Sequence, residues 1–157
     1  MAVGQHGLMG KQNVYEHSVG VPLMIKAAAQ HTGKKTADLC YLIDVFPTLC
    51  DMLQLPVPQS VDGISLLSSL DGKEPVRDYL YYSYMDNQRG ISDGTWKLIE
   101  YHVNGKRTTQ LFNLKNDPWE RNDLSGQKKY EKTIQRLREK MAEEQKRTND
   151  TSVFWNN

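Results

Sequence analysis

The residues best suited to chemistry lie near the start of the chain, between Gly4 and Lys11. Three glycines, Gly4, Gly7 and Gly10, surround His6 and precede the lysine. Glycine accepts positive φ angles and has no side chain, so such a loop can bring backbone amides and an ammonium group close to an anion. The segment therefore predicts an anion site, although many glycine-rich loops bind nothing.

The composition limits the kinds of partner. The chain has 157 residues, a charged fraction of 25% and a net charge of +1. This length is enough for one domain with a buried core. The nearly balanced charge gives no electrostatic reason to expect nucleic acid or an anionic membrane as a partner. The apolar runs are too short to span a bilayer. We therefore expect neither nucleic-acid nor membrane binding.

The first half of the chain is predicted to mix strands and a helix. Val21–Ile25 is apolar and tolerates a proline near its first residue, so we expect a strand there. A second short strand is predicted over Leu39–Ile43. Apolar residues at helical spacing then predict a helix over Val45–Leu53, with Asp44 as its N-cap and Pro47 in its first turn.

The second half reads as a sheet of sequential strands. Asn104-Gly105 separates two of them and is a strong signal for a hairpin turn. The four predicted strands are Tyr79–Met85, Arg89–Ser92, Trp96–Val103 and Arg107–Leu114. Their order along the chain most simply gives an antiparallel meander.

A long amphipathic helix is predicted over Gln127–Arg147. Its apolar residues recur every three or four positions and are Tyr130, Ile134, Leu137 and Met141. One apolar stripe needs one surface to cover it, and we expect that surface to be the sheet. The tail Thr148–Asn157 is expected to fray.

Taken together, these segments resemble the sulfatases of the alkaline phosphatase superfamily. The stretch from Gly4 to Ile25 is similar to the family pattern Gly-x-His-Gly-x-x-Gly-Lys-x-x-x-Tyr-Glu-x-Ser-x-Arg-Val-Pro-Leu-Ile. Further similar stretches follow in the family's order: Leu42–Leu49, Val61–Leu66, Trp96–Ile99 and Leu111–Leu124. Collinear matches are more specific than any one of them alone.

The resemblance implies a fold and a domain organisation. Residues 1–72 would be an α/β fragment, the tail of an alkaline-phosphatase-like catalytic domain. Residues 73–157 would be the α+β C-terminal subdomain, a four-stranded antiparallel sheet with one long amphipathic helix. The chain would then be the C-terminal part of a sulfuric ester hydrolase whose intact parent hydrolyses sulfate esters, with sulfated glycans among the candidate substrates.

The resemblance also assigns roles to the first segment. Lys11 would hold a sulfate oxygen and neutralise the charge that develops as the S–O bond breaks; a solvated loop lysine is the alternative. His6 would lie at the substrate mouth and bind the ester or act as a general acid, or else make a structural hydrogen bond. Tyr15 and Glu16 would brace the loop. Gly20 stands where the family usually carries Arg, which is expected to loosen the packing around Glu16.

Two parts of a sulfatase site are missing from this sequence. The family makes its formylglycine nucleophile from Cys or Ser in a Cys/Ser-x-Pro/Ala-x-Arg motif, and neither Cys40 nor Cys50 begins one. The family's calcium ion is held by aspartates, because it prefers oxygen ligands. We expect Asp38, Asp44 and Asp51 to act only as a cap and a solvated face. No metal site and no cofactor are therefore predicted in this chain, and calcium and formylglycine are expected in the parent.

Several alternatives stay open. The chain alone is expected to be inactive, and a non-catalytic module that binds an anionic glycan or a partner chain is the first alternative. A phosphodiesterase or phosphonate hydrolase of the same superfamily is the second.

Uncovered strand edges predict self-association of the chain. His17, His31 and His102 have no convergent partners in the sequence and are expected to be structural or solvent-facing. The compartment is open: for the parent, the periplasm, secretion and the lysosome are the alternatives.

Overall fold

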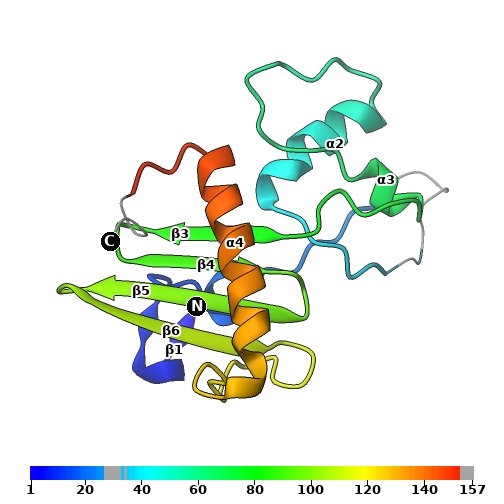
Figure 1. Cartoon of the computed structure of the whole chain (residues 1–157). Coiled ribbons are helices and arrows are strands. Elements are labelled where there is room, and N and C mark those ends of the chain that lie inside the picture. Colours follow the sequence, from blue (N-terminus) through cyan, green and yellow to red (C-terminus); the bar gives the residue numbers. More distant parts are fainter. Residues whose placement is uncertain (27–32, 34, 153–157) are drawn as a thin grey trace. The chain divides into compact units, whose positions relative to one another are not determined.

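A computed structural model describes residues 1–26, 33 and 35–152. The chain divides into two compact units (Figure 1). One unit joins residues 1–22 to the part of the chain that begins at Tyr81, and the other comprises Leu23–Leu80. These units are defined by contacts within this chain. The assignment of residues 1–72 to a larger catalytic domain stays a prediction.

The first unit is built on the predicted four-stranded meander. Its strands are β3 (Leu80–Tyr84), β4 (Gln88–Ser92), β5 (Trp96–Val103) and β6 (Lys106–Asn113), and their spatial order is β3-β4-β5-β6. β4 and β6 both pair antiparallel with β5, which places Ile99 opposite Gly90 on one side and Gln110 on the other. Asn104 and Gly105 both have positive φ, 51° and 73°, as a two-residue hairpin turn between β5 and β6 requires.

The predicted helix covers one face of this sheet. It consists of a 3₁₀ turn (Lys128–Tyr130) followed by α4 (Glu131–Arg147). Ile134, Leu137 and Met141 are buried, and α4 contacts β4 and β5 (Figure 1). Arg138 Nε also lies 2.7 Å from Glu100 Oε1, so the side chain of Glu100 marks the helix-covered face of β5. The predicted helix, its stripe and its covering role are confirmed.

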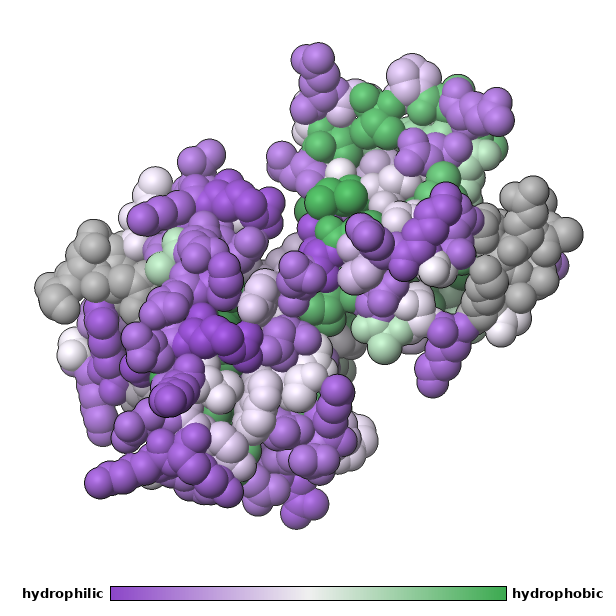
Figure 2. All heavy atoms as spheres, turned by 45° about the vertical axis from the view of Figure 1, so that its right-hand side comes forward, coloured by the Kyte–Doolittle hydropathy of each residue, from purple (hydrophilic) through white to green (hydrophobic). Residues whose placement is uncertain are grey.

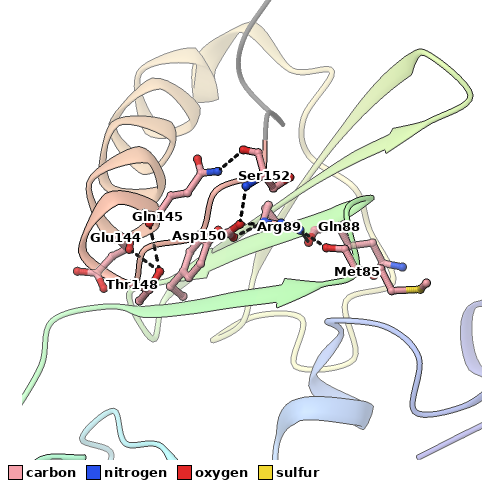
Figure 3. Close-up of polar contacts among 9 residues, drawn as sticks. Met85, Gln88, Arg89, Glu144, Gln145, Thr148, Asp150 and Ser152 are labelled. Carbon is pink, nitrogen blue, oxygen red and sulfur yellow. Dashed lines mark hydrogen bonds and ion pairs between the residues drawn. The ribbon is translucent and has the colours of Figure 1, made fainter. Parts of the chain in front are cut away.

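The chain beyond α4 is fastened to the sheet (Figure 3). Arg89 of β4 is buried, and its Nε and Nη2 lie 2.6 and 3.0 Å from the two carboxylate oxygens of Asp150. The Nη1 of Arg89 donates to the carbonyl oxygen of Met85, and Gln145 Nε2 donates to that of Ser152. The prediction that the tail frays is therefore wrong for residues 148–152, because it could not foresee a buried partner on β4. Residues 153–157 lie outside the described residues.

The start of the chain covers the other face of the sheet. Its elements are β1 (Ala2–Val3), the 3₁₀ turn η1 (Gln5–Gly7), β2 (Met9–Gly10) and α1 (Glu16–Val19). β1 pairs antiparallel with β2. Val14 and Tyr15 are buried in one cluster with Ile99 and Phe112. Side chains alternate along a strand, so Ile99 points away from the face marked by its neighbour Glu100. The sheet is thus sandwiched between α4 and residues 1–20.

The second unit contains η3 (Leu42–Asp44), α2 (Val45–Met52) and α3 (Leu67–Leu70). The predicted helix after Asp44 is confirmed, but both predicted strands are wrong. Residues 21–26 and 39–41 have no regular structure. A strand needs a neighbour to pair its backbone groups, and neither segment has one among the described residues.

Asp44 explains the local structure that replaces the second strand. The predicted N-cap is fully buried, and its carboxylate makes no capping bond to α2. Its Oδ2 instead accepts a hydrogen bond from the amide of Tyr41 at 2.7 Å, and its Oδ1 accepts one from the amide of Ile64 at 2.9 Å. Arg77 forms an ion pair with the same carboxylate. Side-chain bonds to nearby amides favour a tight turn over an extended strand.

The helix α2 leaves much of its apolar surface uncovered. Cys50 is buried, while Phe46 is 51% exposed and Leu49 is 48% exposed. Leu53, which follows the last residue of α2, is 67% exposed. Figure 2 shows apolar surface gathering over the unit of residues 23–80. Within the described part of the chain, no helix combines the length and the apolar character that crossing a membrane requires.

Candidate anion-binding loop and adjoining cavity

The glycine-rich loop adopts the backbone that its sequence predicts. Gly4, Gly7 and Gly10 have φ angles of 100°, 69° and 94°, and His6 itself has a φ of 52°. The amide of Gly4 donates to the carbonyl of Leu8 at 2.9 Å, which closes the loop on itself. Three of these positions are glycine because side chains seldom adopt positive φ.

His6 is held at the edge of the sheet unit by two contacts. Its Nε2 lies 3.2 Å from the carbonyl oxygen of Trp119, and its ring stacks on Tyr15 with 4.1 Å between centroids. Tyr15 is buried and its hydroxyl donates to Gln110 Oε1 at 2.6 Å. The structural hydrogen bond that the sequence left open for His6 is therefore present. A role in binding or proton transfer remains a prediction.

A buried ion cluster holds the other end of the loop. Lys97 of β5 is fully buried, and its ammonium lies 2.8 Å from Glu16 Oε1 and 3.0 Å from Glu120 Oε1. The backbone amide of Glu16 donates to Glu120 Oε2 at 2.6 Å. The Lys97 ammonium also lies 5.0 Å from the ring centroid of Tyr82. Glu16 thus contacts both β5 and the turn that ends at Glu120.

The cluster carries one more negative than positive charge. Glu120 is 1% exposed, and burial raises the pKa of its carboxyl, although Lys97 and the amide of Glu16 act in the opposite direction. Gly20 lies beside the cluster: a Cβ there would meet the carbonyl oxygen of Glu16 at 2.8 Å and its Oε2 at 3.1 Å. A side chain at position 20, where the family usually has Arg, would therefore require Glu16 to shift. In this chain the carboxylate of Glu16 pairs with Lys97.

A cavity of about 550 Å³ opens beside His6. It is lined by Gln5, His6, His17, Pro118, Trp119, Glu120 and Arg121. The His17 ring centroid lies 5.6 Å from that of His6 and 5.7 Å from that of Tyr15. The expectation that His17 has no convergent partners is therefore wrong, because the rings of His6 and Tyr15 stack beside it. His31 lies outside the described residues.

Burial lowers the pKa of His17, with smaller contributions from the positive charges of His6, the amino terminus and Lys97. A neutral imidazole results at pH 7, and it has one N–H donor and one acceptor nitrogen.

Lys11 stands apart from these contacts. Its side chain is exposed and makes no hydrogen bond or ion pair with the part of the chain that the structure describes. It does not line the cavity beside His6. The next two residues, Gln12 and Asn13, line a second hollow of about 470 Å³ together with His6 and Tyr15. The structure thus brings His6, Tyr15 and Glu16 together and leaves the ammonium of Lys11 available to solvent.

The acidic side chains of the described residues are spread over the chain. Nowhere among residues 1–26, 33 and 35–152 do three or more His, Cys, Asp or Glu side chains converge to hold a metal. The carboxylate of Asp44, a predicted cap, already forms an ion pair with Arg77. Cys50 is buried, and burial raises the pKa of the half-buried Cys40, which keeps it a thiol. Calcium and formylglycine remain predictions for a longer protein.

Comparison with known proteins gives a family and a fold. The family model described as N-sulphoglucosamine sulphohydrolase, C-terminal, matches residues 4–147. An N-acetylglucosamine-6-O-sulfatase of Bacteroides thetaiotaomicron is 29% identical over 161 residues, which cover 94% of this chain and 29% of that protein. The chain thus spans less than a third of this relative's length.

Solved structures of larger proteins contain a part that is similar in fold to this chain. A protein determined in complex with its substrate D-glucosamine-2-N,6-O-disulfate superposes with a TM-score of 0.59 at 27% identity, over 73% of this chain and 25% of that chain. A phosphonate monoester hydrolase from Silicibacter pomeroyi gives a TM-score of 0.71 at 22% identity, over 92% of this chain and 32% of that one. At this identity the second likeness shows the fold alone.

Proposed function

Since the chain belongs to the family of N-sulphoglucosamine sulphohydrolase C-terminal domains, we propose that it is the C-terminal part of a sulfatase whose parent hydrolyses sulfate esters. The sheet of β3 to β6 with α4 is the C-terminal subdomain of that family's fold. The observation that carries the proposal is the loop of residues 4–16. It has the family's pattern, and Tyr15 and Glu16 fix it to the sheet while Lys11 stays exposed.

Lys11 and His6 have different tasks in this proposal. The Lys11 ammonium binds a sulfate oxygen and stabilises the charge that develops on the sulfate as the ester bond breaks. His6, held by Trp119 and Tyr15, presents its ring at the entrance next to the loop. Because Nε2 donates to a carbonyl oxygen, Nδ1 is the nitrogen left for the substrate: it accepts from a hydroxyl group in the neutral ring and donates to an ester oxygen when the ring is protonated.

The parent's substrate is proposed to be a sulfated glycan. The relatives' names point to this class, since one acts on N-acetylglucosamine 6-O-sulfate and another structure holds a glucosamine disulfate. The phosphonate hydrolase alternative is weaker, because that likeness shows the fold alone.

We propose further that this chain by itself hydrolyses no sulfate ester. The reason is its sequence and donor set: neither cysteine begins a formylglycine motif, and the described carboxylates do not converge on a metal. Without a nucleophile, Lys11 can supply only electrostatic stabilisation.

The test combines sequencing with an assay. The coding DNA upstream of Met1 should contain an in-frame Asp-His-Gly and a distant Cys-x-Pro-x-Arg, and the protein encoded by the longer frame should cleave a chromogenic aryl sulfate with calcium. The 157-residue chain should give no turnover. Metal-dependent turnover by this chain above that of its Lys11→Ala variant would refute the inactivity.

A further inference from the structure

The cavity beside His6 is formed where two unusual backbone positions meet. His6 and Glu120 have φ angles of 52° and 54°. The two segments contact each other directly, because His6 Nε2 lies 3.2 Å from the carbonyl oxygen of Trp119. A glutamate with positive φ is strained, and such strain persists where the surrounding structure holds it, commonly at ligand sites.

Glu120 and its two neighbours in the chain point to different surroundings. The Glu120 carboxylate points inward to Lys97 and to the amide of Glu16. The adjacent side chains lie on the cavity wall instead: Trp119 is 66% exposed and Arg121 is exposed. The indole of Trp119 is therefore accessible to a ligand in the cavity. The turn therefore brings an aromatic residue and an arginine to one cavity.

We propose that this cavity binds a sulfated pyranose ring. The indole of Trp119 offers an apolar face for the ring, as aromatic side chains do in ligand sites. Arg121 carries a planar fork of donors that matches a sulfate group. His6 and His17 also line the cavity and add imidazole nitrogens to its polar groups. The volume of about 550 Å³ lies in the range of small-molecule sites.

The inference rests on the proposed function and extends it to a second position on the glycan. Lys11, the residue proposed to hold the scissile sulfate, does not line this cavity. His6 is shared by this cavity and by the hollow lined by Gln12, the residue that follows Lys11. The sugar bound by Trp119 and Arg121 is therefore a neighbouring unit of the chain or a second substituent of the same unit, and these two residues set specificity.

The test uses the full chain with D-glucosamine-2-N,6-O-disulfate as the probe, and N-acetylglucosamine as the unsulfated comparison. Binding to the unchanged chain and to every variant is measured by isothermal titration calorimetry. In the chains that keep Trp119, binding is also followed by NMR through the indole N–H signal of Trp119, assigned with a Trp119→Phe variant. The disulfate should shift this signal in a saturable way. Trp119→Ala and Arg121→Ala should each weaken binding at least about tenfold, the loss expected for one charge-assisted or stacking contact. N-acetylglucosamine should bind equally weakly to the Arg121→Ala variant and to the unchanged chain.

Arg147→Ala is the matched control, because it removes the same charge from the helix on the other face of the sheet. It should bind like the unchanged chain, and circular dichroism should show every variant to be folded. The inference is overturned if the Trp119 signal does not move, or if the Trp119 and Arg121 variants bind like the control. Loss of binding in Lys11→Ala alone would leave the proposed function standing and reject this cavity. Loss in the Trp119 and Arg121 variants alone would support the cavity and count against Lys11.

Discussion

Lys97 joins the loop to the sheet through a buried ion cluster. Its buried ammonium is the only positive charge that the described structure pairs with Glu16 and Glu120. Lys97→Met would leave these two carboxylates facing each other without a counter-charge. Breaking a buried ion pair in this way costs about 3–5 kcal/mol, so we expect a loss of that order in the free energy of unfolding, measured with urea.

Two companion variants make this prediction specific. Lys97→Met combined with Glu120→Gln should recover part of the loss, because one of the two unpaired charges is then gone. Lys128→Met changes an exposed lysine and should alter the stability by less than about 0.5 kcal/mol. A loss at Lys97 no larger than that at Lys128 would show that the cluster does not hold the loop.

Lys11 should behave in the opposite manner. In the longer enzyme, Lys11→Ala is expected to lower kcat/KM by about 10²–10³, the usual cost of removing one charge-stabilising group from a preorganised site. Its melting temperature should not change, because the side chain is exposed and has no partner among the described residues. Steady-state kinetics and thermal unfolding measure the two effects. Normal kinetics with a lowered melting temperature would make Lys11 a structural residue.

The sequence predicted only half of this site. His6, Tyr15 and Glu16 were found because they lie within one short motif. Glu120 and Lys97 were missed because they meet Glu16 across 104 and 81 residues of chain. One signal was available: a lysine inside the apolar strand of residues 96–99 is out of place unless a buried carboxylate pairs with it.

Among the elements, the end of α4 is held by a charge that titrates in acid. Burial opposes the ionisation of Asp150, but hydrogen bonds from Arg89 and Tyr81 outweigh it and lower the pKa of its carboxyl. A carboxyl with a lowered folded-state pKa stabilises the fold above its unfolded pKa of about 3.9, and this contribution is lost as the pH falls through the folded value. Asp150→Asn should therefore destabilise the chain at pH 7, by about 3 kcal/mol or more.

The difference between Asp150→Asn and the unchanged chain should shrink as the pH is lowered below about 4. Urea unfolding at several pH values measures it. Asp71→Asn is the control, since Asp71 pairs with a lysine that is 71% exposed, and such pairs contribute little. A difference that is constant from neutral to acidic pH would mean that Asp150 acts by packing and not by its charge.

Elements that depend on local signals were the ones that the sequence predicted well. The β5–β6 hairpin follows from Asn104 and Gly105, and α4 follows from its apolar spacing. Val21–Ile25 and Leu39–Ile43 have strand composition too, yet they form no strand. A strand is stable only when another strand pairs with it, and composition cannot say whether such a neighbour is present.

At the scale of the whole molecule, the described residues leave the apolar side chains of α2 and of its flanking residues uncovered. Leu42, Phe46, Leu49, Leu53 and Leu55 are each 48–67% exposed. The sequence predicted self-association from uncovered strand edges, but those strands are not formed. The apolar face of α2 and its flanks supplies a different reason, because exposed apolar patches are rare in monomers and tend to be buried by association.

We therefore expect the chain to self-associate through this face. Replacing Phe46 or Leu49 with Glu places a charge in the contact and should shift the average mass in light scattering towards the monomer at every concentration. Each variant should remain folded, since the replaced side chains are about half exposed already. Gln59→Glu adds the same charge at an exposed polar position of the same unit and should leave the association unchanged. A chain that stays monomeric over a wide concentration range, or variants that associate as Gln59→Glu does, would show that this face of α2 is not the contact.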